Sequence, residues 1–411
     1  MTSFKKAYIA FFLFVNFISL FSNISEFDII VDGNGNGDFK TINSAINSLP
    51  MYNYQRVVIF IKNGIYNEKI RVDQDFITLL GESRDSTIIQ YNLLREDWVN
   101  NKDEIGPAVI NIHADNIILK NISVFNTQPQ IGPHAFCVYG TGTRTILLNC
   151  NIISKGADAV ALWNYKSGMY YHANCHFEGA VDLVCPRGWC FIINSSFFEV
   201  KKTAAIWHAG VTNENQKFVI KNSQFDGVEG FYLGRHHYEA QFYLINCSFS
   251  NNMIDKPIYR VTYPDNPEKD RPYFYGDRYY FYNCHRETED YKWFKNNLHF
   301  PDSTITPSWT FDNLWDPEIE TTPELINYSI DSNDLILEFS EILSIKGDVS
   351  LKTQNGKIFK FTMGKGRKTI MFSSNQIINE SDIIDGLEVI SGKIISSIAT
   401  IKIREIKTIQ F

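Results

Sequence analysis

Apolar and polar residues alternate in short stretches around an asparagine that recurs along the chain. Each copy has apolar residues at alternate positions, then Asn, then a polar residue, Cys or Ile, then an apolar residue one or two positions further on. Alternation with a period of two predicts β-strands. The gaps between the asparagines are 28, 25, 20, 28, 24 and 37 residues, mostly a spacing typical of a solenoid. The recurring residues are Asn121, Asn149, Asn174, Asn194, Asn222, Asn246 and Asn283.

This spacing predicts an all-β fold, a right-handed parallel β-helix over residues 26–316. Each coil would stack about 4.8 Å from the previous one. The asparagines would then form a ladder at one corner, with each amide bonded to its neighbours in adjacent coils. A helical stretch over 41–48 follows the glycine-rich segment 33–38. No Lys-Ser/Thr pair follows these glycines, so we favour a turn and a helix that covers the open end over a phosphate-binding loop.

The pattern changes after residue 316, where the asparagine ladder stops and aromatic residues become fewer. Short alternating segments predict strands over 335–339, 349–351, 357–361, 369–372, 387–390 and 398–403, with Asn355-Gly356 as a hairpin turn. Strands of this length and spacing predict an Ig-like β-sandwich domain over 317–411. Nothing in it indicates catalysis, so we expect an accessory or spacer role, with glycan binding as the alternative.

The first 25 residues have the pattern of a signal peptide. Lys5-Lys6 precedes an apolar run over 7–21, and small polar residues follow it. A single membrane anchor is the alternative, but a run of about 15 residues is short for a bilayer span. We therefore expect a secreted or periplasmic monomer with no membrane insertion after cleavage. The net charge of −7 argues against a nucleic-acid partner.

The chain has seven cysteines, an odd number for an exported protein. Four of them directly follow a ladder asparagine, which predicts buried positions where Cys acts as a small apolar side chain. Cys185 and Cys190 flank a four-residue segment, and a disulfide between them is left open. No Cys pair has further ligands at zinc-binding spacing, so we expect no metal.

Two aspartates have nearly the same offset from a ladder asparagine. Asp158 lies nine residues after Asn149, and Asp182 lies eight residues after Asn174. The two should therefore stack on successive coils, about 5 Å apart. Small and apolar neighbours surround both, so their pKa values should separate into one protonated and one ionised carboxyl. Such a pair suits an acid and a nucleophile or base, although a calcium site or a surface turn would also fit.

Arg235 lies two coils beyond Asp182 in the predicted solenoid. Coil stacking leaves a gap of about 10 Å, much of which a long side chain can span. A guanidinium at this place would keep one aspartate ionised through a bidentate pair. A surface salt bridge is the alternative for an arginine considered alone.

These residues lie in blocks that resemble the pectin methylesterases (pectinesterases), and the resemblance extends from about residue 27 to residue 316. The similar blocks fall within 32–46, 61–69, 80–89, 156–158, 179–182 and 233–235. The resemblance implies that Asp182 attacks the methyl-ester carbonyl of a galacturonate unit. It further implies that Asp158 protonates the departing methanol and then activates water, while Arg235 holds Asp182 charged. It implies no cofactor, and a partner that is pectin or a pectic oligosaccharide.

The chain departs from this family where the family has two glutamines that polarise the ester. His134 and Ala157 stand at those places, so His134 becomes a candidate oxyanion donor, with a buried packing role as the alternative. Aromatic and basic residues nearby are candidates for contacts with an anionic sugar chain. These candidates are Trp163, Arg187, Trp189, Trp207, His236 and His237.

Two other functions remain as alternatives to a pectin esterase. The first is a catalytically silent β-helix that binds polysaccharide, although mere binding does not need two carboxyls with separated pKa values. The second is a polysaccharide lyase on the same fold. Such lyases typically need calcium-binding acidic clusters, and no comparable cluster occurs in the predicted groove.

Overall fold

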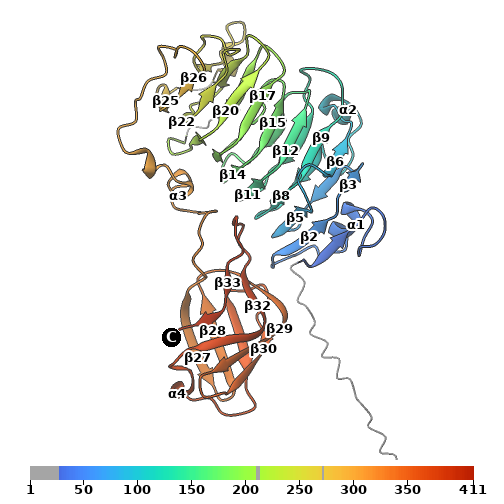
Figure 1. Cartoon of the computed structure of the whole chain (residues 1–411), viewed down its shortest axis with the longest axis vertical. Coiled ribbons are helices and arrows are strands. Elements are labelled where there is room, and N and C mark those ends of the chain that lie inside the picture. The colour runs from blue at the N-terminus through green and yellow to red at the C-terminus, as the bar shows by residue number, and fades with distance from the viewer. Residues whose placement is uncertain (1–26, 210–212, 271–272) are drawn as a thin grey trace, which may run out of the picture.

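The computed structural model describes residues 27–209, 213–270 and 273–411. The predicted signal peptide over 1–25 lies outside these ranges. From residue 29 to residue 286 the chain passes through three parallel sheets in turn and forms a parallel β-helix (Figure 1). Successive coils pair in register; for example, Ile146 pairs with Ile118 of the preceding coil and with Tyr171 of the following coil.

Each sheet forms one long face of the β-helix. The first sheet consists of β1 (Ile29–Val31), β2 (Val57–Ile61), β5 (Ile77–Gly81), β8 (Ile118–Lys120), β11 (Thr145–Leu148), β14 (Met169–Ala173), β16 (Trp189–Ile193), β19 (Phe218–Lys221), β22 (Gln241–Ile245) and β25 (Arg278–Tyr282). The second sheet consists of β3 (Gly64–Tyr66), β6 (Thr87–Tyr91), β9 (Ser123–Asn126), β12 (Asn151–Ser154), β15 (His176–Gly179), β17 (Ser196–Glu199), β20 (Gln224–Gly227), β23 (Ser248–Phe249) and β26 (His285–Arg286).

The third face is divided into two groups of strands. The first group is β4 (Ile70–Val72), β7 (Ala108–Ile112), β10 (Phe136–Gly140) and β13 (Val160–Leu162), and the second is β18 (Ala204–His208), β21 (Tyr232–His236) and β24 (Tyr259–Arg260). Val184 joins the two groups, because it pairs with Val160 on one side and with Ile206 on the other. The coil that contains Asp182 therefore crosses this face with two isolated bridge residues, Val184 and Arg187, in place of a strand.

Inward-facing apolar residues of the coils form one continuous core. Identical positions of neighbouring coils stack, so large side chains form rows along the axis. Phe177, Phe197, Phe225 and Phe249 make one such row, with successive ring centroids 5.2, 4.3 and 5.2 Å apart. This row explains why the apolar pattern of the sequence repeats with each coil.

All seven ladder asparagines have a left-handed backbone, with φ between +49° and +56°. Asn adopts this conformation more readily than most residues, so the tight corner between two sheets selects it. Hydrogen bonds between the side-chain amides link neighbouring asparagines. The Asn149 Nδ2 donates to Asn121 Oδ1 at 2.9 Å, and Asn246 donates to Asn222 and Asn283 to Asn246 at 3.0 Å each. The corner predicted from the spacing is therefore confirmed, but the expected amide hydrogen bonds are found in three of its six neighbouring pairs. The main cause of the corner is the backbone geometry.

All seven cysteines are buried free thiols, including the four that follow ladder asparagines. Cys185 and Cys190 are not bridged. Cys185 belongs to an apolar cluster on the outside of the third face, whereas Cys190 belongs to the interior core.

A short helix covers the first coil, as the sequence predicted. In α1 (Ile42–Asn47), the Thr41 side chain caps the helix by accepting the Ser44 N–H. Ile42, Ala45 and Ile46 are buried in the interior core. The other helices are α2 (Arg95–Asn100), η1 (Pro267–Lys269), η2 (Asp302–Thr304), α3 (Pro307–Thr310) and α4 (Glu380–Ile383). Among the described residues, no helix has the length and apolar character needed to cross a membrane.

The C-terminal strands form one antiparallel sheet with its own apolar core. Its strands are β27 (Leu325–Asp331), β28 (Asp334–Phe339), β29 (Leu343–Thr353), β30 (Ile358–Met363), β31 (Thr369–Ser373), β32 (Leu387–Ser396), β33 (Glu405–Ile406) and β34 (Thr408–Ile409). The hairpin turn at Asn355-Gly356 joins β29 to β30 as predicted, with Gly356 at φ +91°. The two packed sheets of an Ig-like sandwich are not confirmed, because the strands connect into a single sheet.

The strand predicted over 398–403 is wrong. This segment leaves β32 and reaches back to the β-helix (Figure 1), where Ile398, Ala399 and Ile401 pack in a cluster with Trp315. Its apolar residues therefore reflect burial between two parts of the chain. The fully buried Arg56 fixes the contact, since its guanidinium donates to the carbonyls of Asn116 at 2.6 Å and Ser397 at 2.7 Å.

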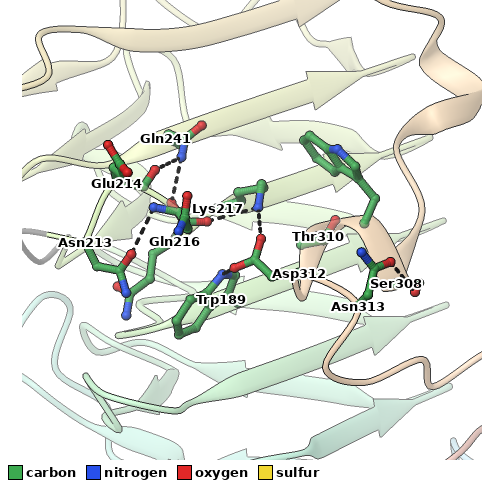
Figure 2. A network of polar contacts seen from close by, with 12 residues as sticks. Trp189, Asn213, Glu214, Gln216, Lys217, Gln241, Ser308, Thr310, Asp312 and Asn313 are labelled. Carbon is green, nitrogen blue, oxygen red and sulfur yellow. Dashed lines mark hydrogen bonds and ion pairs between the residues drawn. The ribbon is translucent and has the colours of Figure 1, made fainter.

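The segment after α3 lies against the first sheet of the β-helix (Figure 2). Asp312 accepts a hydrogen bond from Trp189 Nε1 at 2.8 Å and forms an ion pair with Lys217. Lys217 also lies over the Trp309 ring, with its Nζ 5.0 Å from the centroid. These contacts cover this part of the first sheet, whereas the two aspartates lie at the third face.

Candidate active site

Asp158 and Asp182 occupy equivalent positions on neighbouring coils. Each lies two residues before a valine of the third face, and these valines, Val160 and Val184, pair with each other. The Asp158 N–H donates to Val181 O at 3.0 Å, and the Asp182 N–H donates to Ala204 O of the following coil at 2.7 Å. Both side chains line one cleft, so the structure brings together the two residues whose offsets matched.

The backbone at both aspartates is left-handed. Asp158 has φ +59°, and the consecutive residues Val181 and Asp182 have φ +59° and +60°. This conformation is strained for a β-branched residue such as valine, so the surrounding contacts must hold it. Strain of this kind often occurs where a side chain is aimed for function.

Arg235, in β21, makes a bidentate ion pair with Asp182. Arg235 Nη2 lies 2.6 Å from Asp182 Oδ2, and Nε lies 3.0 Å from Oδ1 and 3.2 Å from Oδ2. Asp182 is only 5% exposed, so this pair is screened little by water. The guanidinium thus fixes the orientation of the carboxylate as well as its charge.

Burial raises the pKa of both aspartates, but Arg235 makes the two unequal. The pKa of Asp158 rises to about 8, first through burial and then through the negative charge of Asp182. Burial also raises the pKa of Asp182, and the hydrogen bonds and charge of Arg235 oppose this rise. At neutral pH the proton therefore belongs on Asp158, while Asp182 is the anion.

His134 lies at the edge of this pair, with its Nε2 3.7 Å from Asp158 Oδ2. The His134 side chain is 54% exposed, and partial desolvation lowers its pKa, as do the positive charges of Arg95 and Arg235. The ring is therefore neutral near pH 7 and has one N–H that it can donate. Ala157, which stands at the second substituted glutamine position, forms a bridge with His134 across neighbouring coils and offers no side-chain donor.

The cleft beside these residues has a volume of about 550 Å³. Arg187 lies in its wall, with the guanidinium carbon 3.8 Å from the Trp163 ring centroid, 4.8 Å from that of Tyr165 and 5.6 Å from that of Trp207. His237 packs edge-on against Trp207. The wall is thus aromatic and basic together, as an anionic sugar chain requires, but the guanidinium covers a face of Trp163.

Two predicted site residues lie outside the cleft. Trp189 is in the first sheet, where the segment after α3 covers it and Asp312 accepts a hydrogen bond from its indole N–H. His236 faces the interior, since its neighbours Arg235 and His237 in this extended segment face the cleft. Its Nδ1 contacts Tyr238 O and its Nε2 contacts Tyr279 Oη.

Six residues of the cleft were absent from the sequence-based set: Arg95, Tyr165, Ala209, Tyr238, Val261 and Tyr263. Tyr165 carried a signal, because it follows Trp163 by two residues. Arg95 begins α2, and Tyr263 follows β24 on a later coil, so neither has a regular offset from a ladder asparagine. Within the described ranges, no three His, Cys, Asp or Glu side chains are placed to hold a metal ion.

The chain is similar to known proteins in sequence and in fold. A family model described as Pectinesterase matches residues 28–240. Probable pectinesterase 49 from Arabidopsis thaliana is 30% identical over 224 residues, which cover 50% of this chain and 58% of that protein. The chain thus spans less than two thirds of this relative's length.

Solved structures share the fold. A pectin methylesterase from Aspergillus niger has a TM-score of 0.57 at 20% identity, covering 70% of this chain and 94% of that one. A pectin methylesterase in complex with a hexasaccharide has a TM-score of 0.54 at 19% identity, covering 72% of this chain and 99% of that one. At this identity the similarity establishes a common fold.

Proposed function

Because this chain belongs to the pectinesterase family, we propose that it hydrolyses the methyl esters of galacturonate units in pectin or pectic oligosaccharides. One observation carries the proposal. A buried carboxylate held by a bidentate arginine lies beside a second carboxyl that keeps its proton at neutral pH, in a cleft with an aromatic and basic wall. The hexasaccharide bound by a related pectin methylesterase supports a sugar chain as the ligand.

In the proposed reaction, an Asp182 oxygen attacks the ester carbonyl carbon, and the carbonyl oxygen becomes an oxyanion. The intermediate then collapses, the bond to the methoxy oxygen breaks, and Asp158 supplies the proton that makes methanol. The ionised Asp158 next takes a proton from water, which attacks the galacturonoyl carbon of the acyl-enzyme anhydride and breaks its bond to the Asp182 oxygen. Galacturonate leaves, Asp182 is free again, and Asp158 holds a proton as at the start.

Arg235 has two effects in this scheme. Its positive charge keeps Asp182 ionised despite burial, and its fork fixes the direction from which the carboxylate attacks. His134 and Arg187 are the proposed donors to the oxyanion and to the anionic substrate, since no glutamine stands at 134 or 157. Trp163, Tyr165, Trp207 and His237 would contact the sugar units.

The remaining features of the chain fit an exported enzyme. We propose that residues 26–316 form the catalytic domain and that 317–411 form an accessory domain. We further propose a secreted or periplasmic monomer that does not insert into membranes and needs no cofactor.

The test is incubation of the purified protein with highly methylated pectin, with methanol and unsaturated product measured together. Methanol without unsaturation is the expected result. Unsaturated product alone would indicate a lyase, and retained binding with neither product would indicate a silent binder. Either outcome would overturn the esterase proposal.

A further inference from the structure

One buried acid near the reacting groups has no part in the reaction described above. Glu199 is the last residue of β17 and is 0% exposed. Both of its carboxyl oxygens accept the Val181 N–H, each at 3.1 Å. Val181 directly precedes Asp182, and both have the left-handed backbone described above. The carboxyl of Glu199 therefore holds the turn that aims Asp182.

The same position recurs in each coil as the last residue of a strand in the second sheet. It is Asn126 in β9, Ser154 in β12, Gly179 in β15 and Glu199 in β17. Asn126 accepts the N–H of the residue two positions later at 3.3 Å, and Ser154 does the same at 2.9 Å. A polar side chain here thus caps the turn that follows its own strand.

The coil of Asp182 lacks this cap, because its residue at the position is Gly179. The N–H two positions later is that of Val181, and Glu199 of the following coil accepts it instead. Glu199 also caps its own turn, since Oε1 accepts the Lys201 N–H at 3.0 Å and the Thr203 hydroxyl at 3.2 Å. One carboxyl therefore caps two turns, which the shorter Asn or Ser could not reach.

The next coil leaves room for this arrangement. The residue paired with Glu199 is Gly227, and a Cβ there would meet Glu199 O at 2.5 Å and Glu199 Cβ at 3.0 Å. Burial raises the pKa of Glu199 to about 8, and the negative charge of Asp182 adds to this rise, so the two carboxyls lie close enough to interact. Burying a carboxyl beside the proposed nucleophile costs free energy, and a purely structural cap would not require an acid at this position.

We propose that Glu199 is a positioning residue that holds the strained Val181–Asp182 turn, and with it the attacking carboxylate, in the conformation that reacts. This inference rests on the proposed function for its kinetic consequence. It predicts that weakening the contact between Glu199 and Val181 lowers the rate of the chemical step more than it weakens substrate binding.

The test compares Glu199→Asp and Glu199→Gln with the wild type in methanol release from methylated pectin. Asp retains a carboxyl for the Lys201 N–H but is too short for Val181, and Gln has a single acceptor oxygen. We expect kcat to fall at least tenfold for Glu199→Asp with KM within twofold, and a smaller fall for Glu199→Gln. Glu178→Asp is the matched control, because Glu178 in the adjacent strand lies outside the cleft and should leave both constants unchanged.

A kcat within twofold of the wild type for folded Glu199→Asp would overturn the inference. Loss of the folded protein in both Glu199 variants, by circular dichroism, would also overturn it, since Glu199 would then be a structural residue. If the wild type itself released no methanol, the proposed function would fail while this inference stayed testable. Crystal structures of wild type and Glu199→Asp would then decide, with an altered turn at Val181–Asp182 expected and an unchanged turn contradicting it.

Discussion

Replacing Arg235 by methionine should change the ionisation of Asp182 more than any other single change in the cleft. The wild-type guanidinium makes three contacts of 2.6–3.2 Å with a carboxyl that is 5% exposed. Removing one partner of a buried ion pair costs about 3–5 kcal/mol, because the other charge is left uncompensated. The cost falls on the ionised form of Asp182, so the pKa of this carboxyl should rise well above its value in the wild type.

The variant would therefore hold Asp182 largely protonated near neutral pH, and a protonated carboxyl is a poor nucleophile. We expect kcat/KM for methanol release at pH 6 to fall at least about tenfold, because fewer Asp182 carboxyls are ionised and the ionised ones have lost their fixed orientation. The acidic limb of the pH profile should move upward. Arg235→Lys should lose less, since it keeps a charge but not the planar fork.

The assay is methanol release between pH 5 and pH 9 for wild type, both Arg235 variants and Arg84→Met. Arg84 pairs with Asp85 on the surface, where such a pair contributes at most about 1 kcal/mol, so this control should behave as wild type. An unmoved acidic limb together with kcat/KM within threefold of wild type in folded Arg235→Met would refute the reasoning.

Two further predictions concern stability. Asp158 has a pKa of about 8 in the fold against an ordinary value near 3.8, so the folded state binds the extra proton and wild-type stability falls as pH rises through this range. Asp158→Asn has no such proton and so removes that loss. In urea unfolding, the stability of the variant minus that of the wild type should increase by up to about 4 kcal/mol from pH 5 to pH 8. A difference that stays constant with pH would contradict this. Arg56→Met should lower the free energy of unfolding by about 3 kcal/mol, because buried carbonyls, including those of Asn116 and Ser397, lose their hydrogen-bond donor. A loss below about 1 kcal/mol would contradict the importance of this contact.

The sequence was most informative where the solenoid repeats itself. The asparagine corner fixes the phase of each coil, because a left-handed backbone recurs there. The nearly equal offsets of Asp158 from Asn149 and of Asp182 from Asn174 therefore sufficed to place the two aspartates together. Arg235 could also be placed, since its side chain bridges the distance across one intervening coil.

The remaining errors arose from contacts that no local pattern contains. Trp189 packs against a segment more than 100 residues later in the chain, and its indole N–H donates to Asp312 of that segment. This contact explains the aromatic residue at position 189. Residues 398–403 alternate like a strand, but they are apolar because they meet the β-helix. His236 was misplaced although alternation with Arg235 and His237 carried the needed signal. Glu199 escaped notice because its partner Val181 lies on another coil.

The central claim is that Asp182 is the nucleophile of an ester hydrolase, and one measurement tests it most directly. Asp182→Asn keeps nearly the same shape without a nucleophilic carboxylate, so its methanol release from methylated pectin should fall more than about 1,000-fold. Circular dichroism should show that the variant remains folded. Methanol release by folded Asp182→Asn at a rate near that of wild type would contradict the account.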